Sequence, residues 1–107
     1  MFKKSYNTSM NLNISNKEVD EELVKVFRAL SDSSRLEIIR LLAHDQEEYN
    51  CTWLGEHIDM SQPTMSYHMK ILREAGLINA RKVSREKFVS LNQDTFDRLI
   101  PGVLDVL

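Results

Sequence analysis

Apolar residues recur at helical spacing in the first third of the chain, which predicts that the folded part begins near Ser15. Ser15 followed by Glu18 forms a capping-box pattern and opens a first helix that ends near Leu30. The residues before it are rich in Asn and Ser and lack periodicity. We therefore expect residues 1–14 to form a flexible N-terminal tail and residues 15–107 to form one domain.

Two further helices are predicted before the middle of the fold. Either Ser31 or Asp32 can cap a second helix, whose apolar residues share one face while Arg40 points away. A polar stretch separates it from a short amphipathic segment in which Thr52 can act as the cap. That segment is the predicted third helix.

The fourth predicted helix has the clearest boundaries. Ser61 is its cap and Pro63 lies in its first turn. Gly76 follows Ala75 at the position where a left-handed residue ends a helix. A tight turn therefore joins the third helix to a well-defined fourth one.

Two short apolar runs after this helix predict a β-hairpin. Leu77 and Ile78 form one strand, residues 88–91 form the other, and the charged segment between them must turn. Asn92 caps a last helix, which Pro101 bends or interrupts. The expected fold class is mostly α with a small β-hairpin, in the order α-α-α-α-β-β-α.

Length and composition exclude several classes of protein. A chain of 107 residues buries one core but has no room for separate catalytic and binding domains. It has no nucleophile elbow, phosphate loop or zinc-hydrolase motif, so an enzyme is not expected. No apolar run is long enough to cross a bilayer, and a single cysteine, Cys51, suits a reducing compartment. We expect a cytoplasmic protein with no membrane partner.

Basic residues are concentrated in one part of the chain. Residues 61–90 contain six Lys and Arg against two Asp and Glu, a net charge of +4, whereas the whole chain has a net charge of -2. The distribution of charge, more than its sum, decides whether a protein can hold nucleic acid. The fourth helix and the hairpin are therefore the candidate binding region.

The fourth helix divides into two faces. At about 100° per residue, Met65, Met69 and Leu72 form a buried stripe. The other side offers hydrogen-bonding groups that can contact base edges and phosphates in a DNA major groove. These candidate residues are Ser61, Gln62, Thr64, Ser66, Tyr67 and Lys70. Each one alone is more simply a solvated polar residue, but their joint placement beside a basic hairpin favours DNA binding.

The hairpin supplies a second candidate contact. It carries Arg81, Lys82, Arg85 and Lys87 against one acidic residue, Glu86. A charged turn alone is ordinary in soluble proteins. After two short helices joined by a tight turn, however, a basic hairpin is typical of a wing that lies along phosphates. The arrangement predicts a winged helix-turn-helix that binds double-stranded DNA.

Two stretches resemble the ArsR/SmtB family of bacterial repressors. They are FRALSDSSRLEIIRLL at residues 27–42 and MSQPTMSYHMKILREAGLI at residues 60–78. The segments FVSL at 88–91 and PGVLD at 101–105 resemble one branch of that family. The resemblance implies a homodimer that binds a palindromic operator and leaves it when an inducer arrives; the inducer is not specified by the sequence.

The usual metal sites of that family are not matched. Its Cys-x-Cys ligand positions fall on Asn50 and Thr52, and Cys51 occupies the apolar position between them. The last helix, which holds the other common site, contains no His. One thiolate cannot hold a metal without partners, so no metal or cofactor is expected. A metal- or redox-sensing repressor that uses Cys51 is the alternative.

The last helix is apolar on more than one face, which is more apolar surface than a small domain buries alone. One helix-turn-helix also contacts too few base pairs to be selective, so two copies are expected. The first and last helices form the candidate dimer interface: Leu23, Val26, Phe96, Ile100, Val103, Leu104 and Leu107. A winged helix that binds protein and not DNA is a second alternative.

Overall fold

The computed structural model describes residues 12–45 and 47–107. Helices dominate, and a small antiparallel sheet completes the fold. In chain order the elements are α1 (Leu12–Leu30), α2 (Ser33–Asp45), β1 (Tyr49–Asn50), α3 (Cys51–Ile58), α4 (Gln62–Glu74), β2 (Ile78–Val83), β3 (Glu86–Leu91), α5 (Gln93–Leu99) and the 3-10 helix η2 (Val103–Val106). The predicted fold class is confirmed, with one added strand and a broken last helix.

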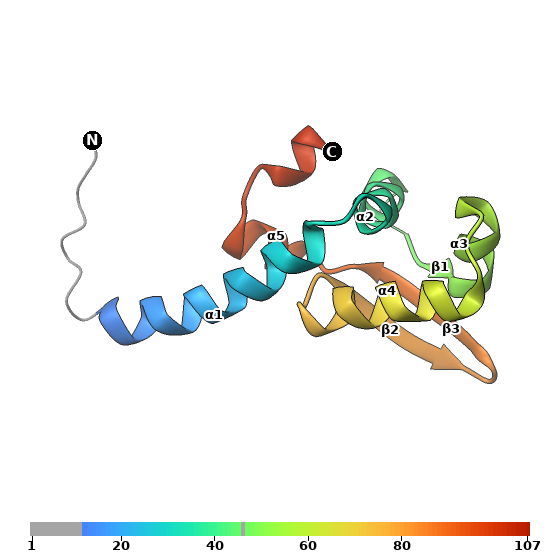
Figure 1. The fold of residues 1–107 in the computed structure, drawn as a ribbon, viewed down its shortest axis with the longest axis horizontal. Helices are drawn as coiled ribbons and strands as arrows, with labels where there is room; N and C mark the ends of the chain where they lie inside the picture. The colour runs from blue at the N-terminus through green and yellow to red at the C-terminus, as the bar shows by residue number, and fades with distance from the viewer. Residues whose placement is uncertain (1–11, 46) are drawn as a thin grey trace.

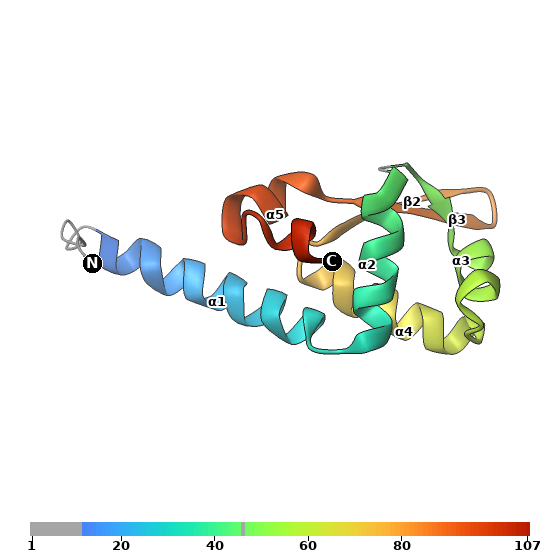
Figure 2. The ribbon, with the colours of Figure 1, turned by 90° about the horizontal axis from the view of Figure 1, so that it is seen from above.

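The elements gather the predicted binding region at one end of the molecule. Helix α4 runs alongside the β2–β3 hairpin, and α2 packs across both of them (Figures 1 and 2). Helix α3 lies near the tip of the hairpin, whereas the N-terminal half of α1 extends beyond the opposite end (Figure 1). None of the helices in the described ranges is long and apolar enough to span a membrane.

One apolar cluster holds these elements together. The helices contribute residues at helical spacing, such as Ile38, Ile39 and Leu42 of α2, and the sheet contributes Val89. Removal of this apolar surface from water is the main stabilising term of the fold. The buried members are Val26, Ala29, Ile38, Ile39, Leu42, Leu54, Met65, Met69, Leu72, Leu77, Ile78, Val89 and Phe96.

Two residues predicted for the dimer interface belong to this core. Val26 is fully buried in α1 and Phe96 is almost fully buried in α5. A side chain with no exposed surface in one chain cannot bury more against a second chain, so the structure corrects both predictions. The other predicted interface residues stay partly exposed; they are Leu23, Ile100, Val103, Leu104 and Leu107.

Helix α1 begins at Leu12, before the predicted cap Ser15. Ser15 therefore lies inside the helix, and the capping-box interpretation is wrong. Ser and Asn each cost well under about 1 kcal/mol inside a helix, so they do not force it to start later. The end at Leu30 is as predicted. Residues 12–14 are helical, and residues 1–11, the rest of the predicted tail, lie outside the described residues.

Helix α2 takes Asp32, and not Ser31, as its cap. The Arg35 backbone N–H donates to Oδ2 of Asp32 at 3.1 Å. This hydrogen bond lowers the pKa of the Asp32 carboxyl. The Ser31 hydroxyl instead donates to the Arg28 carbonyl at 2.7 Å, at the end of α1. The two neighbouring polar residues thus end one helix and begin the next.

Strand β1 is a feature that the sequence pattern does not predict. Tyr49 and Asn50 pair with β3 and give a sheet in the order β1-β3-β2. Asn50 then caps α3, because its Oδ1 accepts from the backbone N–H groups of Thr52 and Trp53 at 2.7 and 3.3 Å. The expectation that Thr52 is the cap is wrong; Asn is at least as good a cap as Thr.

The hairpin strands extend farther than predicted. Only Ser84 and Arg85 remain in the turn between β2 and β3, and Ser84 adopts a positive φ of 58°. All but the first residue of β2 are exposed, so charged side chains fit on the strand without being desolvated. The charged residues between the two apolar runs therefore lie mostly in the strands and not in the turn. The wing is correspondingly longer.

The last helix is interrupted at Pro101, as predicted. Helix α5 ends at Leu99, Gly102 adopts a φ of 88°, and η2 begins at Val103. Asn92 occupies the N-cap position of α5, although its side chain makes no capping hydrogen bond. The C-terminal segment therefore folds back as two short pieces and not as one long helix (Figure 1).

Candidate DNA-binding surface

A tight turn sets α4 against α3. Asp59 ends α3 with a positive φ of 62°, and the Met60 N–H donates to the Gly55 carbonyl at 2.7 Å. A Cβ atom on Gly55 would lie 2.6 Å from Nε2 of Gln62 and 3.0 Å from the Met60 carbonyl oxygen. The Gln62 amide can move aside, but the Met60 carbonyl belongs to the backbone and would have to shift, so glycine suits this approach best. The close contact fixes the orientation of α4 relative to α3.

The start and end of α4 agree with the sequence prediction. Ser61 caps the helix, since its Oγ accepts from the Thr64 N–H at 3.4 Å. The same hydroxyl donates to Oγ1 of Thr64 at 3.0 Å. Gly76 follows the helix with a φ of 78°. Two of the predicted DNA-contacting residues are thus held together at the first turn.

The two faces of α4 are as the helical wheel predicts. Met65, Met69 and Leu72 are buried, and His68 is buried beside them. Nη1 of Arg35 lies 3.1 Å from Nδ1 of His68; because arginine only donates, Nδ1 must accept. All the predicted contact residues of this helix are exposed: Ser61, Gln62, Thr64, Ser66, Tyr67 and Lys70.

A small hollow brings the helix and the wing together. It has a volume of about 130 Å³ and is lined by residues of α3, α4 and the hairpin. Gln62 and Ser66 contribute from α4, while Arg85 and Lys87 contribute from the hairpin. Hydrogen-bonding side chains on a helix therefore lie beside cations on a wing, and this is the combination that reading a groove and binding its phosphates uses.

Arg81 differs from its neighbours in the wing in having an acidic partner. Its Nε and Nη2 donate to the two carboxylate oxygens of Glu48 at 2.6 and 2.7 Å. Its guanidinium also lies over the Phe88 ring, 5.3 Å from the centroid. The hydrogen bond from Arg81 lowers the pKa of Glu48. Glu48 compensates this charge, so Arg81 fastens the wing to the domain.

Two lysines of the wing lie directly opposite each other. Lys82 of β2 pairs with Lys87 of β3 in the strand register. Like charges at opposing positions destabilise a strand pair, and a bound anion relieves the repulsion. Together with Arg85 in the turn, they place three cations at the end of the wing.

Asn50 connects the wing to the helix-turn-helix. While its Oδ1 caps α3, its Nδ2 donates to Oε1 of Glu86 at 2.8 Å. Glu86, the single acidic residue of the hairpin turn region, is therefore engaged with the protein. The sequence gives no local signal for this contact, because the two residues are 36 positions apart.

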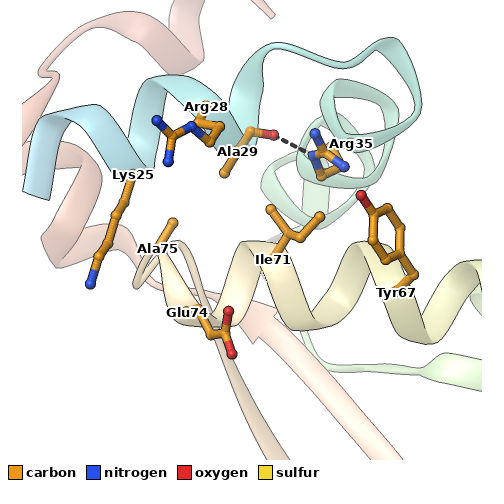
Figure 3. A pocket seen from close by; sticks show the side chains of 8 residues that line it. All are labelled: Lys25, Arg28, Ala29, Arg35, Tyr67, Ile71, Glu74 and Ala75. Atoms are coloured by element: carbon orange, nitrogen blue, oxygen red, sulfur yellow. Dashed lines mark hydrogen bonds between the residues drawn. The ribbon is translucent and has the colours of Figure 1, made fainter.

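Tyr67 lies on a different side of α4 from the hollow. It borders a cavity between α1 and α4, with its hydroxyl turned toward Arg35 (Figure 3). The sequence pattern places Tyr67 with Gln62 and Ser66 among the candidate DNA-contacting residues. In the structure Tyr67 borders the cavity beside α1, whereas Gln62 and Ser66 border the hollow beside the wing. Arg35 and the cavity were not identified from the sequence, since their residues come from three helices.

Cys51 is half-buried at the start of α3. Burial raises the pKa of its thiol, and the charge of Lys87 offsets only part of that effect. Within residues 12–45 and 47–107, no group of three or more His, Cys, Asp and Glu side chains is placed to hold a metal ion. A raised thiol pKa argues against Cys51 as a reactive thiolate.

We expect iodoacetamide to modify Cys51 more slowly at pH 7 in the folded protein than in the same chain unfolded in urea. Burial lowers both the thiolate fraction and the access of the reagent. Mass spectrometry of timed samples measures both rates. An equal or faster rate in the folded protein would instead support the redox-sensing alternative.

The helix-turn-helix, the basic wing and their shared hollow define a winged-helix DNA-binding protein. A family model described as "Bacterial regulatory protein, arsR family" matches residues 32–80. The HTH-type transcriptional regulator YceK of Bacillus subtilis is 48% identical over 92 residues, covering 85% of this chain and 92% of the relative. The arsenical resistance operon repressor of Staphylococcus aureus is 42% identical over 83 residues, which are 78% of each chain.

Solved structures share the fold. HlyU from Vibrio cholerae superimposes with a TM-score of 0.62 at 26% identity, covering 76% of this chain and 94% of that one. A homodimeric winged helix-turn-helix DNA-binding domain from Mycobacterium bovis gives a TM-score of 0.69 at 23% identity, covering 92% and 82%. With these relatives, the chain belongs to the arsR family of bacterial regulatory proteins.

Proposed function

We propose that this protein is a transcriptional repressor that binds a palindromic operator as a homodimer and is released by an inducer. The observation that carries the proposal is the hollow in which Gln62 and Ser66 of α4 meet Arg85 and Lys87 of the wing. Relatives named as repressors support it. A regulator of this kind acts on the chromosome, so we place it in the cytoplasm.

In this proposal α4 enters the major groove with its N-terminal half. Gln62 can pair with an adenine edge, and the hydroxyls of Thr64 and Ser66 can bond bases or phosphates. Lys70 reaches a phosphate, and the wing lies along the neighbouring backbone through Lys82, Arg85 and Lys87. Arg81 adds a fourth cation to the wing; its ion pair with Glu48 is exposed and weak enough to yield to a phosphate.

A second copy of the chain covers the apolar side of α1 and the C-terminal segment. Val24 and Phe27 of α1 are 50% and 57% exposed, and Val106 is 78% exposed. Exposed apolar residues that gather on one side of a helix favour association. Val24 and Phe27 therefore replace Val26 and Phe96 in the proposed interface, beside Leu23, Ile100, Val103, Leu104 and Leu107.

A gel-shift titration tests the proposal directly. The probe is the promoter DNA upstream of the gene that encodes this chain, and a shuffled duplex of equal length is the competitor. A specific complex at moderate salt, with two chains per duplex, is the expected result. The absence of any specific complex would overturn the repressor proposal and favour a winged helix that binds protein.

Arg85→Ala should weaken binding to every DNA sequence alike. Removing one phosphate contact lowers the slope of log K against log salt concentration by about 1. Fluorescence anisotropy at several salt concentrations measures this slope. Lys17→Ala is the matched control, since Lys17 is an exposed cation on α1, outside the hollow and the wing, and its loss should leave the slope unchanged. An unchanged slope in Arg85→Ala would contradict the assignment of the wing.

The names of several relatives give metal sensing as a second candidate. Relatives at 42% identity are arsenical resistance operon repressors, and a cadmium resistance regulator is 30% identical. Elemental analysis of the purified protein by mass spectrometry decides between the candidates. Stoichiometric zinc, copper, cadmium or arsenic would establish a metal signal, and its absence after growth with these elements would support a different inducer.

A further inference from the structure

A second hollow that touches α4 lies on another side of this helix, against α1. This cavity has a volume of about 520 Å³, within the usual range of small-molecule sites. Lys25 and Arg28 line it from α1, Arg35 from α2, and Tyr67, Ile71 and Glu74 from α4 (Figure 3). It therefore joins a helix of the proposed dimer interface to the helix that is proposed to read DNA.

Arg35 is a buried cation whose hydrogen-bonding capacity is only partly used. Its residue exposure is 9%, its Nε donates to the Ala29 carbonyl at 2.7 Å, and its Nη1 donates to His68. In the described residues its Nη2 has no protein acceptor, and no carboxylate forms a salt bridge with it. Asp32, the nearby acid, accepts from the backbone N–H of Arg35 and not from the guanidinium. Asp32 interacts electrostatically with this charge but forms no salt bridge with it. A buried guanidinium with an unused donor is costly, and a directly bound anion would lower that cost.

The lining specifies the chemical class of the ligand. Three cations and one carboxylate, Glu74, give the wall an excess of positive charge. The Glu74 carboxylate also points away from Arg35 (Figure 3). The Ile71 side chain lies between the two helices and offers an apolar contact (Figure 3). A molecule that fits both the positively charged wall and the apolar contact has one carboxylate and a compact apolar body.

The geometry points to this cavity as the inducer site, with a small apolar carboxylate as the inducer. This inference deepens the proposed function and rests on it. The ligand carboxylate takes the unused N–H donors of Arg35 and the Tyr67 hydroxyl, while Lys25 and Arg28 add positive charge to the wall from α1. The apolar body lies against Ile71.

Binding there acts on α4 by a short physical route. Arg35 donates to His68, a buried residue of α4, and Tyr67 of the same helix lies edge-on to His68 with ring centroids 5.4 Å apart. A ligand that draws the Arg35 guanidinium toward the cavity moves or loosens this contact. It favours a different position of α4 relative to α1, which is how a ligand with unequal affinity for two states shifts their populations.

Calorimetric titration of the DNA-free protein tests the site. The probes are benzoate, phenylacetate and hexanoate, with benzyl alcohol as the uncharged match for benzoate. We expect the carboxylates to bind and benzyl alcohol to bind at least roughly tenfold more weakly, because a charge-assisted hydrogen bond is lost. Carboxylate-induced NMR shifts should appear at Tyr67 and Ile71. No binding by any carboxylate, or equal binding by benzyl alcohol, would overturn the inference.

Two variants of α1 localise the binding. Arg28→Gln should weaken benzoate binding by roughly tenfold, since one of the charges that line the cavity is removed. Lys17→Gln is the matched control: it removes the same charge from the same helix outside the cavity and should bind as the wild type does. Both side chains are exposed, so neither change should unfold the chain. Equal affinities in the two variants would contradict the placement.

Adding benzoate to the operator complex then separates this inference from the proposed function. Release of DNA at the ligand concentration that saturates the cavity is expected. Binding without release would overturn the inducer role. Failure to form an operator complex before benzoate is added would overturn the proposed function, while the calorimetric result would still decide whether the cavity binds carboxylates.

Discussion

Phe96→Ala is expected to lower the free energy of unfolding by about 3–5 kcal/mol. The Phe96 side chain is among the largest that the fold buries completely, and α5 carries it into the core beside the sheet. Its removal loses the transfer free energy of the ring and leaves a cavity that close-packed neighbours cannot fill. For a domain of this size, such a loss is a large part of the total stability.

Urea unfolding followed by circular dichroism, at two protein concentrations, measures this loss. Asp105→Asn is the control in the same C-terminal region, because an exposed polar side chain outside the proposed interface residues should change the stability of the chain by less than about 0.5 kcal/mol. Should Phe96→Ala leave the stability of the folded chain intact and only dissociate the dimer, the side chain would be an interface residue and the core assignment would fail.

Gln62→Ala should reduce discrimination between operator and unrelated DNA by roughly 10- to 100-fold, as expected for the loss of a bidentate contact to a base. Gln62 is exposed at the first turn of α4 and lines the hollow that the wing shares. Binding to unrelated DNA depends on cations, which the substitution leaves in place. Specific binding should therefore fall while non-specific binding changes little.

Competition binding with operator and shuffled duplexes measures the ratio. Gln93→Ala is the control, because Gln93 lies at the start of α5 and donates to Asp97 at 2.9 Å, away from the hollow. If Gln62→Ala weakened both duplexes equally, Gln62 would serve the backbone or the fold and not the reading of bases. Gln62 also lies close to Gly55, where α3 and α4 meet. The free energy of unfolding of Gln62→Ala should therefore be measured as well, to show that the variant is folded.

Local signals made part of this structure predictable. Ser61 and Gly76 set the limits of α4 through backbone geometry that involves only nearby residues. The buried stripe of the same helix follows from its period alone. For that reason the exposed residues of α4, the core of the candidate site, could be identified without coordinates.

Contacts between distant residues could not be predicted in this way. The Arg81–Glu48 pair joins residues 33 positions apart, and the Arg35–His68 pair has the same separation. Helical periodicity shows that Phe96 faces an apolar neighbour, but it cannot tell whether that neighbour belongs to the same chain or to a second one. For this reason the sequence pattern places Val26 and Phe96 in the dimer interface, although the structure buries both in the core of one chain.

The double use of Asn50 has a consequence for regulation. One side chain caps α3 and also holds Glu86 of the hairpin, so the helix pair and the wing are tied to each other by the same residue. Bending the wing away from its helix would break these hydrogen bonds. In a homodimer, we expect a signal to change instead the distance or the tilt between the two DNA-binding surfaces, so that both no longer match successive turns of the same duplex.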